Sequence, residues 1–213
     1  MSEIDFLNTV PGIDVSQYQG KIDWKAVKQS GKIFVYIKAT DGINGVDPMF
    51  EENWNDSKSA GIIRGAYHFF YANEDAEAQA TNFIKNVTGF SKGDLPPVLD
   101  LEITNNAEPQ LIIQNSLRML ELLREKYNVT PVVYTNPTFG NRYLDARFER
   151  FPLWIANYSV NRPVIPSAWQ KRGFTFWQYS ESGKVNGIFG NADLDLFNGT
   201  FEDFQKFLFT SSV

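Results

Sequence analysis

Stretches that favour β-strands alternate with stretches that favour α-helices, and this alternation constrains the fold more than any other feature of the chain. The alternation predicts a strand at 12–17, followed by a helix at 22–31 that ends at Gly31. The same order then repeats, with strands predicted at 33–40, 62–70, 96–102 and 131–136 and helices at 50–61, 75–87 and 108–127. Strand–helix alternation of this kind is typical of parallel βα units.

The last third of the chain has a different pattern. Strands are predicted at 151–158 and 174–180 with no strong helix between them. We expect Asn136-Pro137 to start a turn and Asn186-Gly187 to lie in a hairpin turn before a last strand at 191–197. An amphipathic helix is predicted at 201–209.

About eight strands favour a closed barrel over an open sheet, although 213 residues are fewer than the ~250 that such barrels usually have. We therefore predict the α/β class and an irregular TIM-like barrel, with about five βα units followed by three further strands. The alternative is a doubly wound sheet, but no glycine-rich phosphate loop follows the first strand. We expect 1–213 to be a single catalytic domain, without an appended wall-binding module.

Composition excludes several classes of protein. The net charge is −5 with no basic cluster, so nucleic acid is not an expected partner. The chain has no cysteine, which excludes disulfides and thiolate chemistry. Residues 1–12 carry Glu3 and Asp5 and do not resemble a signal peptide, and no apolar run is long enough to span a membrane.

The segment LPPVLDLEIT at 95–104 places two acids at the end of an apolar strand. Alternate side chains of a strand point to one face, so Asp100 and Glu102 would project together, about 7 Å apart along the strand. A solvated strand end, or a salt bridge to a nearby Lys or Arg, would also explain such a pair. Two like charges on a partly buried face repel each other, and a functional site is one reason to keep them there.

Catalytic groups of a βα barrel lie at the C-terminal ends of its strands, and the other predicted ends carry acids and aromatic residues. They are Asp14, Tyr36, Lys38, Tyr67, His68, Tyr134, Trp154, Asn157, Trp177, Tyr179, Asp193 and Asp195. Acids surrounded by aromatic rings are what a sugar-cleaving cleft requires, because one carboxyl protonates the leaving oxygen and the rings contact the sugar. Each residue taken alone also has a structural explanation. Asp14 could cap a strand end, Trp177 and Tyr179 could be core residues, and the lone His68 could have a structural role.

The order of motifs resembles the glycoside hydrolase family 25 muramidases, the lysozyme type found in phage endolysins and bacterial wall enzymes. GIDVSQYQGKIDW is similar to the opening motif of that family, and FVYIKATDG, GAYHFF and PVLDLE are similar to its second, third and fourth strands. PVVYTN, LWIANY, FWQYS and the closing NADLDLF follow in the same order. The resemblance covers about 12–197.

The resemblance implies hydrolysis of the β-1,4 bond between N-acetylmuramic acid and N-acetylglucosamine in peptidoglycan, without a cofactor or metal. It implies that Glu102 is the general acid, with its pKa raised by Asp100. Asp100 would be either a nucleophile or the residue that orients the N-acetyl group of the substrate, and we favour the second role. Asp14 and Asp193 would set the electrostatics of the cleft. The substrate contacts would come from Tyr36, Lys38, Tyr67, Tyr134, Trp154, Asn157, Trp177 and Tyr179.

Two positions depart from the family pattern: Asp41, where the family often has Glu, and Asp195, where it more often has Asn. Three alternatives remain: a chitinase-like glycosidase, a barrel that only binds glycan, and an acidic metal site. Catalytic zinc usually takes histidines, and the chain has only His68. We expect a monomer that acts on the bacterial wall, outside the cell, in the periplasm or after release at lysis.

Overall fold

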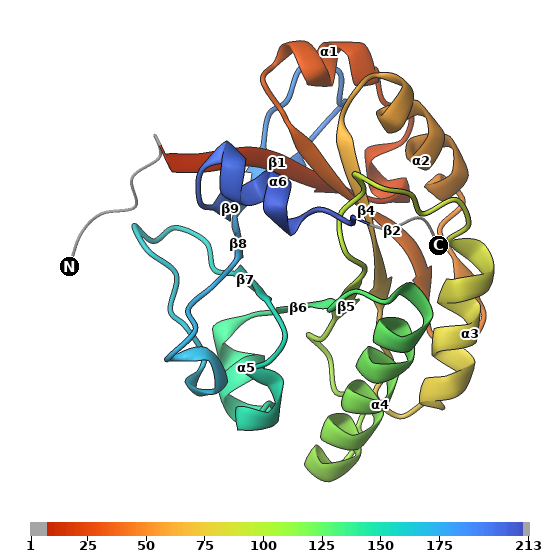
Figure 1. The fold of residues 1–213 in the computed structure, drawn as a ribbon, viewed down its shortest axis with the longest axis vertical. Coiled ribbons are helices and arrows are strands. Elements are labelled where there is room, and N and C mark those ends of the chain that lie inside the picture. Colours follow the sequence, from red (N-terminus) through yellow and green to blue (C-terminus); the bar gives the residue numbers. More distant parts are fainter. Residues whose placement is uncertain (1–7, 211–213) are drawn as a thin grey trace.

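The computed structural model describes residues 8–210 and shows a barrel of eight strands with helices around its outside (Figure 1). Residues 1–7, which include Glu3 and Asp5, and residues 211–213 lie outside the described part. The strands are β1 (Thr9–Val15), β2 (Phe34–Asp41), β3 (Gly45–Val46), β4 (Ile63–Phe69), β5 (Val98–Asp100), β6 (Val132–Thr135), β7 (Leu153–Ala156), β8 (Phe176–Gly183) and β9 (Ala192–Asn198).

Strands β1 and β2 pair and close the barrel, while the short β3 pairs only with the end of β2. Apart from β3, neighbouring strands from β1 to β8 are parallel, and β9 runs antiparallel between β8 and β1. The helices are α1 (Trp24–Gln29), α2 (Phe50–Ser59), α3 (Ala76–Asn86), α4 (Pro109–Tyr127), α5 (Pro137–Tyr143) and α6 (Phe201–Phe207), with short 3₁₀ turns η2 (Gln17–Gln19), η3 (Ala146–Phe148) and η4 (Ser167–Trp169). Five βα units followed by three strands confirm the predicted barrel.

Two local predictions were wrong. Asn136-Pro137 begins a helix rather than a turn, because the Asn136 side chain caps α5 by accepting a hydrogen bond from the Phe139 amide at 2.9 Å. Proline is favoured at the first helical position, where its missing N–H costs nothing. Strand β5 is shorter than predicted and ends at Asp100, so that Glu102 lies just beyond it.

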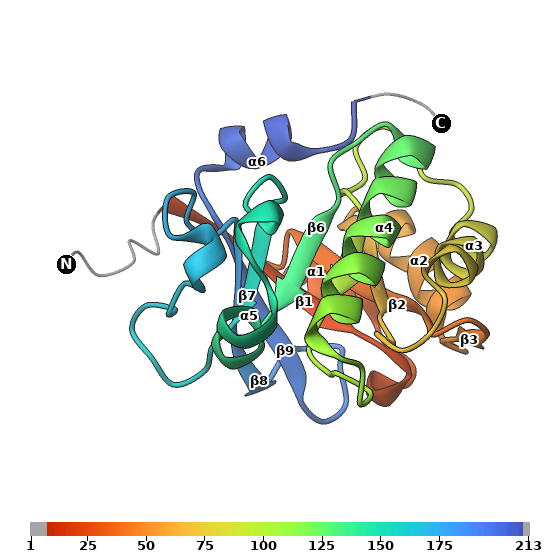
Figure 2. The same cartoon turned by 90° about the horizontal axis from the view of Figure 1, so that it is seen from below.

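Apolar side chains form one layer inside the barrel and another between the barrel and its helices. In β5, Val98 belongs to the inner cluster and Leu99 to the outer one, as expected for alternation along a strand buried on both faces. Helix α6 lies across one end of the barrel (Figure 2), where Phe204 packs against Phe34 and Phe197 with ring centroids 5.4 and 5.2 Å apart. This packing closes the N-terminal end and leaves the C-terminal strand ends for the site.

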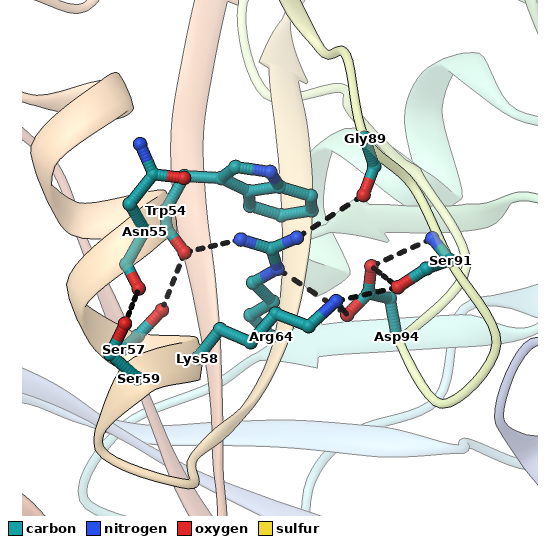
Figure 3. Close-up of polar contacts among 9 residues, drawn as sticks. All are labelled: Trp54, Asn55, Ser57, Lys58, Ser59, Arg64, Gly89, Ser91 and Asp94. Atoms are coloured by element: carbon teal, nitrogen blue, oxygen red, sulfur yellow. Dashed lines mark hydrogen bonds and ion pairs between the residues drawn. The ribbon is translucent and has the colours of Figure 1, made fainter.

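Arg64, near the start of β4, joins α2 to the segment that leads into β5 (Figure 3). Its guanidinium lies 3.6 Å from the ring centroid of Trp54 and donates hydrogen bonds to the backbone carbonyls of Trp54 and Gly89. Nε donates to Oδ1 of Asp94 at 3.3 Å, and both side chains are almost fully buried. This partnered charge holds the outer layer together on the side of the barrel near β4.

Candidate active site

A pocket of about 310 Å³ opens at the C-terminal ends of the parallel strands. Every strand of the closed barrel contributes to it, including the antiparallel β9, which contributes Asp193 near its start. The lining residues are Asp14, Ser16, Tyr18, Gln19, Lys38, Tyr67, Phe69, Asp100, Glu102, Tyr134, Trp154, Tyr158, Gln178, Glu181 and Asp193. The four acids expected to be catalytic and four of the eight expected substrate contacts therefore meet in one cavity.

Asp100 and Glu102 reach the pocket from the same chain segment, and the intervening Leu101 belongs to the outer apolar cluster. Asp100 is only 6% exposed, and its Oδ1 has no hydrogen-bond partner among residues 8–210, whereas Glu102 is half-buried. Burial raises the pKa of Asp100 well above its usual range, and the charge of Glu102 raises it further. Burial also raises the pKa of Glu102, against the lowering effect of Lys38 and with a further rise from Asp193.

The direction predicted for the pKa of Glu102 agrees with the structure, but the predicted cause was wrong. Repulsion within the pair raises the pKa of Asp100 instead, because Asp100 is the more deeply buried carboxyl and holds its proton more tightly. Desolvation is the main reason that the pKa of Glu102 is raised. A carboxyl whose pKa is raised in this way suits a general acid.

Lys38 supplies positive charge beside the carboxyl pair. Its Nζ lies 3.0 Å from Oδ2 of Asp41 and 4.9 Å from the ring centroid of Phe69. Asp41, one of the two departures from the family pattern, therefore serves as the ion-pair partner of Lys38. The charge of Lys38 limits how far burial raises the pKa of Glu102.

Asp14 is held by a hydrogen-bond chain that crosses the barrel. Gln178 donates from Nε2 to Oδ2 of Asp14 at 2.5 Å. The hydroxyls of Tyr134 and Tyr158 both donate to Oε1 of Gln178, at 2.9 and 2.5 Å. Two donors on the amide oxygen fix which way the Gln178 amide faces, so that its N–H₂ points to the carboxylate.

Asp193 and Asp195 lie on β9 opposite β1, where Asp193 pairs with Asp14 and Asp195 with Gly12. Asp193 lines the pocket, and burial raises its pKa to about 6. Asp195 is completely buried beneath the lining and accepts a hydrogen bond from Nε1 of Trp154 at 2.8 Å.

Aromatic rings form the floor and one wall of the cavity. Trp154 lines the pocket and stacks on Tyr36 with centroids 4.8 Å apart and an interplanar angle of 26°. Tyr134 and Tyr67 meet Trp154 edge-on at 4.8 and 6.5 Å. These stacked rings hold the indole rigidly and present apolar surface of the kind that sugar rings contact.

Four predicted substrate contacts lie outside the pocket. Tyr36 is completely buried one layer below Trp154 and bonds to the Pro96 carbonyl, so it supports the floor rather than lining it. Trp177 and Tyr179 occupy the alternate face of β8 and pack in the outer layer, where Trp177 donates to the Asn157 carbonyl. The Asn157 side chain accepts from the Val164 amide at 2.9 Å and orders a loop.

The lining includes residues that the sequence reasoning missed: Ser16, Tyr18, Gln19, Phe69, Tyr158, Gln178 and Glu181. Gln178 follows Phe176 by two residues and shares its inward face, but only the structure shows that Phe176 lies in the inner cluster. Tyr18 and Gln19 belong to the η2 turn after β1, whose position depends on tertiary contacts.

His68 has a structural role. It is completely buried, with Nδ1 2.7 Å from Oγ1 of Thr40 and Nε2 3.1 Å from Oε1 of Gln79. Burial lowers its pKa to about 4, so it remains neutral. Within 8–210, no group of three or more His, Cys, Asp or Glu residues is arranged to hold a metal ion.

Comparisons with known proteins agree with this geometry. The family model described as glycosyl hydrolases family 25 matches residues 13–188. The protein YegX of Escherichia coli is 37% identical over 94% of this chain and 74% of its own length. Lysozyme M1 of Streptomyces globisporus is 38% identical over 90% of this chain and 68% of its own. The crystal structure of the bacterial lysozyme from Streptomyces coelicolor superposes with a TM-score of 0.88 at 34% identity, covering 93% of this chain and 96% of that one.

Proposed function

The chain belongs to glycosyl hydrolases family 25, and from that premise we propose a division of labour among the acids of its pocket. The protein is a glycoside hydrolase of the lysozyme type, a muramidase that hydrolyses peptidoglycan. The bond it cleaves is the β-1,4 linkage between N-acetylmuramic acid and N-acetylglucosamine. The observation that carries the proposal is the meeting of Asp14, Asp100, Glu102 and Asp193 in one cavity floored by Trp154.

Glu102 is the general acid. Burial keeps it protonated to a higher pH than an exposed glutamate, and its position on the lining gives it access to the glycosidic oxygen. It transfers its proton to that oxygen as the bond to the anomeric carbon breaks. In the second half of the reaction its carboxylate takes a proton from the attacking water.

Asp100 assists the N-acetyl group of the substrate instead of attacking the anomeric carbon itself. Attack requires an ionised carboxylate, and burial beside Glu102 makes Asp100 the acid of this pair that ionises less readily. The acetamido oxygen therefore forms the bond to the anomeric carbon, giving a cyclic oxazolinium ion, and Asp100 hydrogen-bonds to the acetamido nitrogen. Water then opens this ring and restores the acetamide.

Asp14 and Asp193 provide negative potential that stabilises the positive charge developing on the sugar. Their pKa values are raised by burial, so the negative charge they provide grows as the pH rises. Trp154, Tyr134, Tyr67 and Lys38 contact the sugar rings and their substituents. We propose that the protein acts as a monomer on walls that it reaches outside the cytoplasmic membrane or after lysis. Within 8–210, no helix is long and apolar enough to cross a membrane.

The test is digestion of purified peptidoglycan and, in parallel, of chitin, with the new reducing ends identified. Reducing-end muramic acid from peptidoglycan supports the proposal, and activity on chitin alone would indicate a chitinase-like enzyme. ¹H NMR of freshly released ends tests the route, because N-acetyl assistance retains the β configuration. Inversion at the anomeric carbon would exclude it.

A further inference from the structure

Asp195 is a completely buried carboxyl that lies behind the pocket lining, and only one of its two oxygens accepts a hydrogen bond from a neutral donor. Trp154 donates from Nε1 to Oδ1 at 2.8 Å. The other oxygen, Oδ2, is buried and receives no hydrogen bond from an amide, amine or hydroxyl group of residues 8–210. An unpartnered oxygen on a fully buried acid is costly, so a further interaction is expected there.

The group next to Asp195 is the carboxyl of Asp14. Asp195 pairs with Gly12 across β1 and β9, so Asp14, two residues farther along β1, is its diagonal neighbour on the same face. The two side chains are within hydrogen-bonding reach of each other. Since neither carboxylate carries a donor, that hydrogen bond requires a proton between them.

Oδ2 of Asp14 accepts from Gln178 and Oδ1 of Asp195 accepts from Trp154, so in each acid a neutral donor holds one of the two oxygens. Burial first, and then the charges of Asp195 and Asp193, raise the pKa of Asp14 well above its usual range. Burial raises the pKa of Asp195 to about 8, with a smaller rise from Asp193 and an opposing effect from the positive charge of Lys32. Two carboxyls in contact within a buried site do not both ionise at neutral pH.

Other ionisable groups face the pair. Asp193 lies on β9 directly across from Asp14 and is also within hydrogen-bonding reach of it, Tyr36 and Tyr67 lie on β2 and β4, and Lys32 precedes β2. Burial raises the pKa values of Tyr36 and Tyr67 well above the usual range, so both remain neutral hydroxyls. Asp193 titrates with a pKa of about 6 and adds negative charge above that pH, which favours retention of the proton between Asp14 and Asp195.

We propose that Asp195 is a positioning residue that holds Asp14 through one shared proton, so that the two carboxyls present a single negative charge to the floor of the pocket. Asp195 does not line the cavity and acts on it through the two lining residues that it contacts, Asp14 and Trp154. The proposal rests on the muramidase function only where activity is measured. The shared proton also changes how protein stability depends on pH, and that measurement needs no substrate.

The experiment measures the thermal midpoint against pH for the wild-type protein, Asp195→Asn, Asp14→Asn and the exposed control Asp56→Asn. A native state that holds a proton with a raised pKa loses stability as the pH rises from the unfolded value towards the folded one. Either buried variant removes the shared proton and this loss with it. We expect the difference between the thermal midpoint of each buried variant and that of the wild type to shift by roughly 5 °C in favour of the variant as the pH rises from about 5 to 8. Asp56→Asn removes the same formal charge and should follow the wild-type slope.

Activity on peptidoglycan separates positioning from simple packing. The substitution Asp195→Asn keeps an oxygen for Trp154 and introduces an N–H₂ that donates to an ionised Asp14, so the single negative charge persists. Asp195→Asn should retain about tenfold more activity than Asp195→Ala, which leaves the indole N–H unpaired. If the thermal midpoints of the wild type and of the two buried variants change equally with pH, the proposal of a shared proton is wrong, whatever the substrate proves to be. Equal activity of Asp195→Asn and Asp195→Ala would overturn the positioning role.

Discussion

Gln178 and Asp14 are joined by a hydrogen bond of 2.5 Å between β8 and β1, across 164 positions of the sequence. The bond orients an acid of the pocket, and the Gln178 amide is itself oriented by the hydroxyls of Tyr134 and Tyr158. One neutral side chain therefore connects three strands of the barrel at the level of the pocket.

Gln178→Met should lower kcat/KM by about 10- to 100-fold, because Asp14 loses a donor and two tyrosine hydroxyls lose their shared acceptor. The measurement is the initial rate of reducing-end release from peptidoglycan. Gln110→Met on the exposed face of α4 is the matched control. A rate for Gln178→Met within twofold of this control would show that the chain through Gln178 does not support catalysis.

Tyr18→Ala should raise KM about 3- to 10-fold with little change in kcat, because an exposed ring on the lining contributes binding surface rather than chemistry. Tyr18 is 83% exposed, and Phe189, which is 95% exposed, lies outside the lining. Phe189→Ala is therefore the matched control, and its KM should not change. Equal effects of the two substitutions would contradict the assignment of Tyr18 to the substrate cleft.

Lys38→Met should move the alkaline limb of the kcat/KM profile to higher pH. The positive charge of Lys38 lowers the pKa of Glu102, so its removal lets burial raise that pKa further, and the general acid keeps its proton longer. The readout is the position of the limb rather than its height, because Lys38 also lines the pocket. A limb that moves to lower pH would mean that Glu102 is not the acid observed in the profile.

Arg64→Met should lower the free energy of unfolding by about 3 kcal/mol, because it removes the buried charged partner of Asp94 and leaves only the exposed Lys58, whose Nζ lies 3.9 Å from Oδ1 of Asp94. Urea unfolding followed by circular dichroism measures this change. The exposed pair of Arg118 and Glu77 provides the control, and Arg118→Met should shift the urea midpoint far less. Similar midpoints for the two variants would mean that the Arg64 cluster is not a major source of stability.

The barrel could be predicted because its strands and helices have distinct periodicities and follow one another in order. The acids at strand ends could be predicted for the same reason, since parallel strands bring their C-terminal ends together. Trp177 and Tyr179 could not be distinguished from Gln178 as lining residues, because both faces of a parallel barrel strand are buried and the sequence does not show which one faces inward.

Other features depended on tertiary structure. The depth of Asp100 relative to Glu102 decides which carboxyl bears the repulsion within the pair, and that depth comes from packing around β5. The contact of Asp195 with Asp14 depends on the register between β9 and β1, whose strands are about 180 residues apart in sequence. Helix α5 was missed because proline begins helices as readily as it begins turns.

The most direct test of the central claim is mass spectrometry of purified peptidoglycan digested with the wild-type protein, with Glu102→Gln and with the exposed control Glu52→Gln. We predict fragments with reducing-end muramic acid from the wild type and the control, and a loss of about 10²- to 10⁴-fold for Glu102→Gln in a folded protein. Equal digestion by Glu102→Gln would contradict the assignment of Glu102 as the general acid, and fragments with other reducing ends would contradict the assigned bond.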